Sequence, residues 1–217
     1  MASKIIGVSI VLLIAISSFG YYLYHQPIII GFEKTEQPVT IEKTESYKET
    51  LSRVRQKALL AKDYIKSHHF NKTTCFLIDM RLPSGKYRFF VYNLTSDTIE
   101  KEGLVTHGSG SVSETNELIF SNTPNSNCTS IGKYKIGNAY EGKFGLAYKL
   151  YGLDITNSNA FERFIVLHAF ECVPDNEVAP QPICVSLGCP TVSTAFLQQL
   201  KTYIDKSSKP ILLWIYY

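Results

Sequence analysis

The sequence predicts a mainly β domain with one internal helix, preceded by an N-terminal helix. After Phe70 the apolar residues come in short runs rich in β-branched and aromatic residues, and Asn, Gly, Ser and Pro separate these runs. Apolar residues recur at helical spacing in one stretch before Phe70 and in one stretch late in the chain. The 217 residues suffice for a single core with appendages, and 45% apolar with 19% charged residues is ordinary for a folded domain.

The first helix is expected over residues 46–69, where apolar residues recur at alternating steps of three and four positions. These residues are Leu51, Val54, Ala58, Ala61 and Ile65. A heptad coiled coil is the alternative, but the stretch is short for one. The helix is therefore expected to pack its apolar face on the domain.

The strands are expected to begin with an antiparallel meander, because turn residues at 83–85 and 95–97 separate the first three runs. Those runs cover residues 75–80, 87–93 and 98–106, and further strands are expected at 132–136, 146–151, 164–168 and 211–216. The late helix carries Phe196, Leu197, Leu200 and Ile204 on one face. Ser193 or Thr194 can cap its start, and Pro210 follows its end.

The N-terminus indicates export. Lys4 precedes an uncharged run at residues 5–24, and about twenty helical residues span the hydrocarbon core of a bilayer. Residues 1–25 are interpreted as a membrane anchor or signal peptide, with an uncleaved inner-membrane anchor favoured, and residues 26–45 as a linker. Residues 46–217 then form the domain, outside the cytoplasm. The net charge of +3 is scattered, which argues against nucleic acid as a partner.

Five cysteines are present, and an odd number in an oxidising compartment leaves at least one sulfur outside a disulfide. Cys189 follows Gly188, which can adopt backbone angles that present the sulfur outward. The amides of Gly188 and Cys189 are candidate oxyanion donors, since Pro190 has none. The alternative for Cys189 is a disulfide with Cys172 or Cys184, which is the more common fate of a cysteine in an exported protein.

His168 is the candidate base for this thiol, because it ends an apolar run that is expected to be a buried strand. The alternative is a structural histidine bonded to the backbone. Neither CxxC nor HxxxH spacing occurs, so no metal or other cofactor is expected.

Several ordered motifs resemble the murein L,D-transpeptidase catalytic domain, specifically the second YkuD-like branch, in which proline follows the cysteine. The motifs are 106–110, 120–124, 130–134, 142–145, 153–154, 166–168 and 186–190, and the resemblance runs from about Leu51 to the C-terminus. It implies a β-sandwich with a helix, with Cys189 as nucleophile and His168 as base. It also implies that Ser186 and Gly188 shape the motif around the nucleophile.

The chain departs from this pattern at several positions. Ala169 follows the base where the family commonly has Gly, and Thr191 and Val185 stand where many members carry an Arg. Residues 169–185 are expected to form an extended lid, braced by a disulfide between Cys172 and Cys184. His107 is a candidate substrate-orienting residue, with a hydrogen-bonded strand-end histidine as the alternative.

The resemblance implies an enzyme of the bacterial cell envelope, on the periplasmic side, anchored or secreted after signal cleavage. Its thiolate would attack peptidoglycan stem peptides, form a thioester, and pass the acyl group to a stem amine or a protein amine. With water as acceptor, the same residues would give an L,D-carboxypeptidase. A non-catalytic peptidoglycan-binding module is the alternative from another class.

Overall fold

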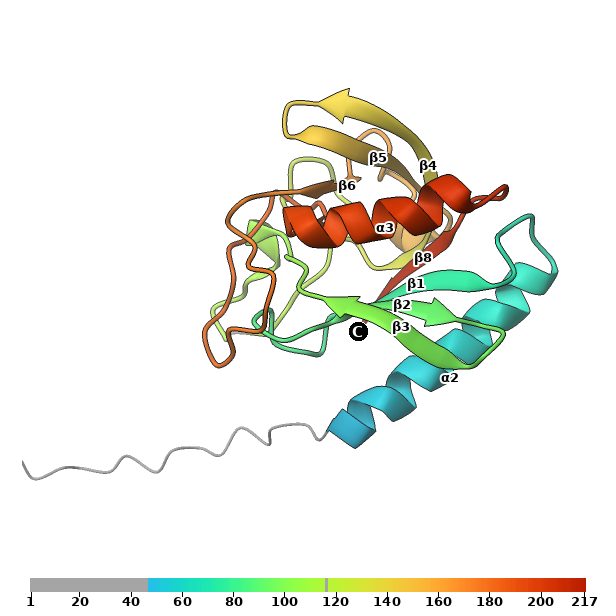
Figure 1. Ribbon diagram of the computed structural model, residues 1–217. Coiled ribbons are helices and arrows are strands. Elements are labelled where there is room, and N and C mark those ends of the chain that lie inside the picture. The colour runs from blue at the N-terminus through green and yellow to red at the C-terminus, as the bar shows by residue number, and fades with distance from the viewer. Residues whose placement is uncertain (1–46, 116) are drawn as a thin grey trace, which may run out of the picture. The chain divides into compact units, whose positions relative to one another are not determined.

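The computed structural model describes residues 47–115 and 117–217, shown as the coloured ribbon of Figure 1. The expected anchor or signal peptide and the expected linker lie outside these residues, as does residue 46 of the expected domain. Within the described part of the chain, no helix combines the length and apolar character needed to cross a membrane.

The described residues of the domain form two helices and eight strands, with two short 3-10 helices. The helices are α2 (Tyr47–Lys66) and α3 (Thr194–Lys206). The strands are β1 (Thr74–Asp79), β2 (Phe89–Asn93), β3 (Thr98–Gly103), β4 (Gly132–Gly142), β5 (Gly145–Gly152), β6 (Val166–Ala169), β7 (Thr191–Val192) and β8 (Leu212–Tyr216). The predicted meander is confirmed, because β2 pairs antiparallel with both β1 and β3.

The eight strands form one sheet in the order β3-β2-β1-β8-β4-β5-β6-β7. Successive side chains of a strand point to opposite faces, so Phe76 and Ile78 of β1 enter one core while Cys75 and Leu77 enter another. The second core receives the apolar face of α2, with Val54 among its members. The first receives α3, which Figure 1 shows in red between the two halves of the sheet.

This first core confirms the predicted fold class and shows how the sandwich is built. It takes Phe89 from β2 and Leu150 from β5, in opposite halves of the sheet, and Leu200 from α3. The two halves of one continuous sheet therefore share a single core.

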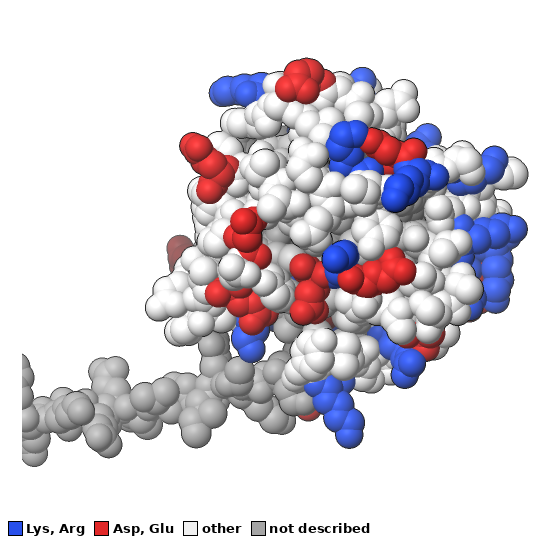
Figure 2. All heavy atoms as spheres, in the orientation of Figure 1, with Lys and Arg blue, Asp and Glu red and all other residues white. Residues whose placement is uncertain are grey.

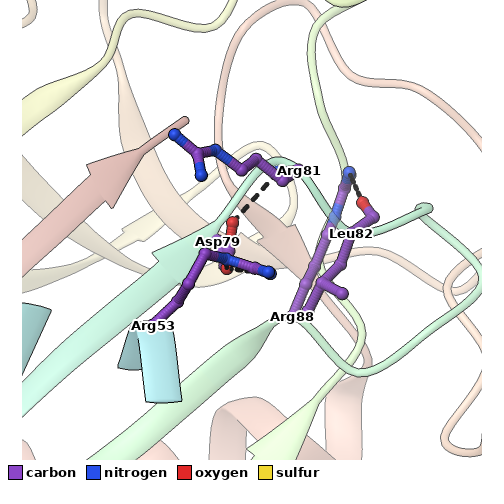
Figure 3. Close-up of polar contacts among 5 residues, drawn as sticks. All are labelled: Arg53, Asp79, Arg81, Leu82 and Arg88. Carbon is purple, nitrogen blue, oxygen red and sulfur yellow. Dashed lines mark hydrogen bonds and ion pairs between the residues drawn. The ribbon is translucent and has the colours of Figure 1, made fainter. Parts of the chain in front are cut away.

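A buried polar cluster supports the end of β1. Asp79 is fully buried and accepts hydrogen bonds from Arg53 on α2, at 2.6 and 2.9 Å, and from the Arg81 amide at 3.0 Å (Figure 3). The guanidinium of Arg88, also buried, donates to the carbonyl of Leu82 at 3.1 Å and to that of Val105 at 2.7 and 2.9 Å. Arg88 thereby ties β2 to the segment after β3.

Two local predictions need correction. The strand expected at 164–168 begins at Val166, because Phe164 has a φ of 56°, outside the β region, and its side chain is 84% exposed. The two-residue strand β7, which precedes the late helix, was not predicted. Ser193 caps that helix, since its side chain accepts a hydrogen bond from the Phe196 amide.

The face in Figure 2 is mostly uncharged, with Asp, Glu, Lys and Arg side chains among the white ones and several Lys and Arg together along its right edge. Both signs of charge therefore occur on this side of the domain.

Candidate active site

Two short parallel strands bring Cys189 and His168 to one cavity. His168 of β6 pairs with Thr191 of β7, and Cys189 lies two residues before β7. The cavity has a volume of about 380 Å³, and both side chains line it. A larger cavity of about 480 Å³, between β4 and the end of α3, has no cysteine or histidine among its lining residues.

The segment after β3 forms one wall of this site by running beside the segment that ends in β7. The Ser186 amide donates to the His107 carbonyl at 2.9 Å, and the Ser109 amide donates to the Ser186 carbonyl at 2.7 Å. The Thr106 amide donates to the Thr191 carbonyl at 2.9 Å. Two motifs far apart in the sequence are thus joined by backbone hydrogen bonds.

Three hydroxyl groups converge on the carbonyl oxygen of Cys189. Ser186 Oγ lies at 2.7 Å, Thr106 Oγ1 at 3.2 Å and Thr191 Oγ1 at 3.4 Å. A carbonyl oxygen offers two lone pairs, so the shortest contacts satisfy it. The backbone of Cys189 is therefore contacted by hydroxyl groups from three residues.

Gly188 supplies the turn that precedes Cys189. Its φ is +112°, and a Cβ built on it would lie 2.7 Å from the Cys128 carbonyl oxygen. Its amide donates to Ser186 Oγ at 3.1 Å and is therefore occupied. Of the two amides expected to form an oxyanion hole, only that of Cys189 has no acceptor among the described residues.

The thiol of Cys189 lies against the backbone that leads into β6. Its Sγ is 3.6 Å from the Phe164 carbonyl oxygen, an acceptor that favours the protonated S–H form. Burial raises the pKa of the thiol, while the Val166 amide and the charge of Arg163 act to lower it. The thiol is thus protonated at rest and needs a base.

The imidazole of His168 is held in one tautomer. Nδ1 lies 2.9 Å from the Ala169 carbonyl oxygen, which can only accept, so Nδ1 carries the proton. Nε2 faces Thr191 Oγ1 at 3.2 Å, and the Phe144 ring stacks on the imidazole with centroids 5.0 Å apart. Burial lowers the pKa of His168, and the hydrogen bond to Ala169 acts in the opposite direction. The neutral ring therefore presents a basic Nε2.

The side chains of Cys189 and His168 are not hydrogen-bonded to each other in this structure. Both line the same cavity, however, and such contacts are often long in an enzyme without substrate. Rotation of the thiol away from the Phe164 carbonyl is the movement that the proton transfer would require.

A family comparison identifies the domain. Residues 47–216 match the family model of the L,D-transpeptidase catalytic domain.

The chain belongs to the L,D-transpeptidase catalytic domain family.

Solved structures with a similar arrangement are distant in sequence. They include an L,D-transpeptidase from Mycobacterium smegmatis, with 11% identity, a TM-score of 0.39 and coverage of 67% of this chain and 59% of that one. The helical cell shape determining protein Pgp2 from Campylobacter jejuni has 11% identity, a TM-score of 0.42 and coverage of 66% and 47%. Bd1075 from Bdellovibrio bacteriovorus has 17% identity, a TM-score of 0.41 and coverage of 68% and 51%.

The alignment with these structures therefore spans about half of their length. Among curated proteins, none matches this sequence significantly.

In this L,D-transpeptidase domain His107 is buried and does not line the cavity. Its Nδ1 lies 3.0 Å from the guanidinium of Arg88, which can only donate, so Nδ1 accepts and the ring is neutral. Burial and the charge of Arg88 lower the pKa of His107 to about 4. The backbone of His107, rather than its ring, contacts Ser186.

The disulfide between Cys172 and Cys184 is present, as expected from the sequence. It closes the segment between β6 and the nucleophile, and Phe170 and Val185, just outside it, line the cavity. Cys75, Cys128 and Cys189 are free, and the first two are buried. Cys189 is therefore the partly exposed thiol among the described residues.

Sequence reasoning missed Arg163, which also lines the cavity. Its guanidinium donates to the carbonyls of Ser121 and Cys128, at 2.9 and 2.7 Å, and to Ser126 Oγ at 3.3 Å. No Asp or Glu lines the cavity or pairs with Arg163 among the described residues. The cleft therefore carries an unneutralised positive charge, and no sequence motif signals it.

Proposed function

We propose that this domain is a cysteine-dependent L,D-transpeptidase that acts on peptidoglycan stem peptides through a thioester. The observation that carries the proposal is the shared cavity of a free Cys189 thiol and a neutral His168 imidazole whose Nε2 carries the basic lone pair. A thiol with an adjacent base of this kind is the arrangement that acyl transfer requires.

The reaction follows from these two groups. His168 Nε2 takes the proton of Cys189, and the thiolate attacks the carbonyl of the L-centre of the diamino acid at the third stem position. His168 returns that proton to the amine of the fourth-position D-amino acid, which leaves as the thioester forms. An acceptor amine then attacks the thioester and loses a proton to His168. The Cys189 thiolate leaves and takes this proton from His168, so the thiol is restored.

Arg163 suits the donor in this reaction. A tetrapeptide stem ends in the carboxylate of the D-amino acid that leaves, and a guanidinium is the usual partner for a carboxylate. Most of the exposed side chains that line the cavity are apolar, and they include Phe144, Phe164 and Leu187. Arg163 would therefore fill the role left open by Thr191 and Val185.

The acceptor is a stem amine or a protein amine. The domain acts in the cell envelope, on the periplasmic side. The N-terminal segment, outside the described residues, would hold the domain at the inner membrane or direct its secretion. Both statements rest on the expected substrate and on the apolar run at residues 5–24.

The test is incubation of the full chain with purified muropeptides, followed by mass spectrometry. Loss of the fourth-position residue with a new cross-link is the expected product, and Cys189→Ala should abolish it. Release of that residue without a cross-link would replace transpeptidation with the carboxypeptidase reaction. Binding of muropeptides without any turnover by the wild-type chain would sink the proposal in favour of a binding module.

A further inference from the structure

Thr191 places a hydroxyl group between the proposed base and the backbone of the proposed nucleophile. Its Oγ1 lies 3.2 Å from His168 Nε2 and 3.4 Å from the Cys189 carbonyl oxygen. The side chain is buried, and its position is fixed because the Thr191 amide donates to Thr106 Oγ1 at 3.1 Å. The hydroxyl can therefore turn its proton without moving its oxygen.

The Thr191 hydroxyl proton can point in either of two directions, and the protonation state of His168 determines which one it takes. When the imidazole is neutral, Nε2 has a lone pair and accepts the Thr191 O–H. When Nε2 takes the thiol proton, it becomes a donor, and Thr191 Oγ1 must accept from it. The Thr191 proton then turns away from Nε2, toward the side of the Cys189 carbonyl oxygen, where Ser186 Oγ and Thr106 Oγ1 make the shorter contacts.

The charges around His168 explain why Thr191 Oγ1 is an important acceptor for the imidazolium N–H. Arg163 lines the same cavity, and the Nζ of Lys143 lies 5.5 Å from the centroid of Phe144, the ring that stacks on His168. Glu171 follows β6 by two residues but does not line the cavity, and no other carboxylate lines it. Apart from the Cys189 thiolate that forms with it, an imidazolium here meets positive charges and two neutral oxygens, those of Ala169 and Thr191.

We propose that Thr191 is a positioning residue that stabilises the imidazolium form of His168 while the Cys189 thiol is deprotonated. The inference rests on the proposed function in one respect, the assignment of His168 as the base. In the step, the S–H bond breaks and an N–H bond forms at Nε2. That N–H donates to Thr191 Oγ1, and the proton later leaves with the departing amine.

The test is the rate of Cys189 alkylation by iodoacetamide as a function of pH, followed by peptide mass spectrometry on the full chain. Thr191→Val removes the hydroxyl at almost constant shape, and Thr191→Ser keeps it. At neutral pH, where the thiolate forms together with the imidazolium, Thr191→Val should slow alkylation by about tenfold. Thr191→Ser should return the rate to within about twofold of the wild type. At alkaline pH the thiolate forms without the imidazolium, so the rates should converge.

A rate for Thr191→Val equal to that of Thr191→Ser at neutral pH would overturn the inference. An equal deficit at every pH would also overturn it, because a purely structural defect behaves in that way. If Thr191→Val does not fold, Thr191→Ala takes its place with the same expected result. Thr202→Val, on the exposed side of α3, is the matched control for the loss of a threonine hydroxyl.

His168→Gln separates this inference from the proposed function. If His168→Gln leaves the alkylation rate unchanged, the base assignment itself is wrong. If His168→Gln slows alkylation and Thr191→Val does not, the base assignment stands and only the role of Thr191 is lost. Muropeptide turnover, measured separately, tests whether peptidoglycan stem peptides are the substrate.

Discussion

The guanidinium of Arg88 lies 3.0 Å from Nδ1 of His107, and both side chains are buried. Arg88 remains protonated, since burial lowers its pKa only to about 9. It belongs to the buried polar cluster of Figure 3, and the His107 carbonyl accepts the Ser186 amide at 2.9 Å. A chain of contacts therefore leads from the interior of the sheet to the segment that carries Cys189, and a neutral His107 is one of its links.

Acid should weaken the domain through His107. The pKa of His107 is about 4 in the folded chain, whereas an unfolded histidine titrates at about 6.5. The unfolded state therefore binds the proton first, and the contribution of this residue is complete above pH 6.5 and is lost as the pH falls toward 4. It amounts to as much as about 3 kcal/mol of unfolding free energy.

The measurement is urea denaturation of the wild type and of His107→Gln between pH 4 and pH 7, the window set by the two pKa values. Gln keeps an acceptor for Arg88 but does not titrate. The difference between the two proteins should therefore shrink as the pH falls. A difference that stays constant over this range would show that His107 does not bind a proton on unfolding there.

The disulfide should contribute to stability by restricting the unfolded chain. Cys172 and Cys184 are separated by 12 residues, and closing a loop of this size contributes about 2–3 kcal/mol. The double variant Cys172→Ala/Cys184→Ala should lose that amount in chemical denaturation. Intact-mass analysis after alkylation, with and without reductant, should report two further alkylated cysteines on reduction. No such mass change would mean that the pair is open in solution.

The sequence predicted the strands and helices that have strong local patterns. In α2, Val54, Ala58 and Ala61 are buried at the expected spacing, because one helix face must cover one side of the sheet. Cys189 and His168 were also found from their motifs, and the structure places both in one cavity. Patterns of this kind depend on the local sequence and on which side of an element faces the core.

The features that escaped prediction are set by tertiary contacts. Phe164 adopts a positive φ, which its residue type disfavours, and the strand therefore begins later than its apolar run suggests. Strand β7 has two residues, too few for a periodic pattern. Arg163 and Thr191 become part of the site only when β6 lies beside β7. The spacing of residues in the sequence does not predict that Arg163 and Thr191 line the same cavity.

Gly188→Ala should destabilise the domain and disturb the nucleophile. An alanine would have to adopt a φ of +112° and place its Cβ 2.7 Å from the Cys128 carbonyl oxygen. Backbone strain and this clash together should cost about 2–4 kcal/mol, and alkylation of Cys189 should change because the turn must shift. Thermal and urea denaturation give the free energy.

Gly145→Ala is the matched control for that variant. Gly145 also has a positive φ, +76°, but a Cβ there would meet nothing closer than 3.6 Å. It should cost only about 1 kcal/mol, since it adds strain without a clash. Equal losses in the two variants would contradict the role assigned to the close approach between Gly188 and Cys128.

Arg163 provides the sharpest test of the donor that the cleft accepts. Arg163→Gln removes the positive charge, so a tetrapeptide stem with a free terminal carboxylate should bind about tenfold more weakly, seen as a higher KM. The same stem with an amidated terminus lacks the partner charge, so its KM should change little. Arg163→Lys keeps a charge but lacks the planar fork that contacts the carbonyls of Ser121 and Cys128, and should give an intermediate KM for the free acid. An equal rise in KM for the acid and the amide would mean that Arg163 only holds the cavity wall, because a charge contact with the donor must distinguish the two stems.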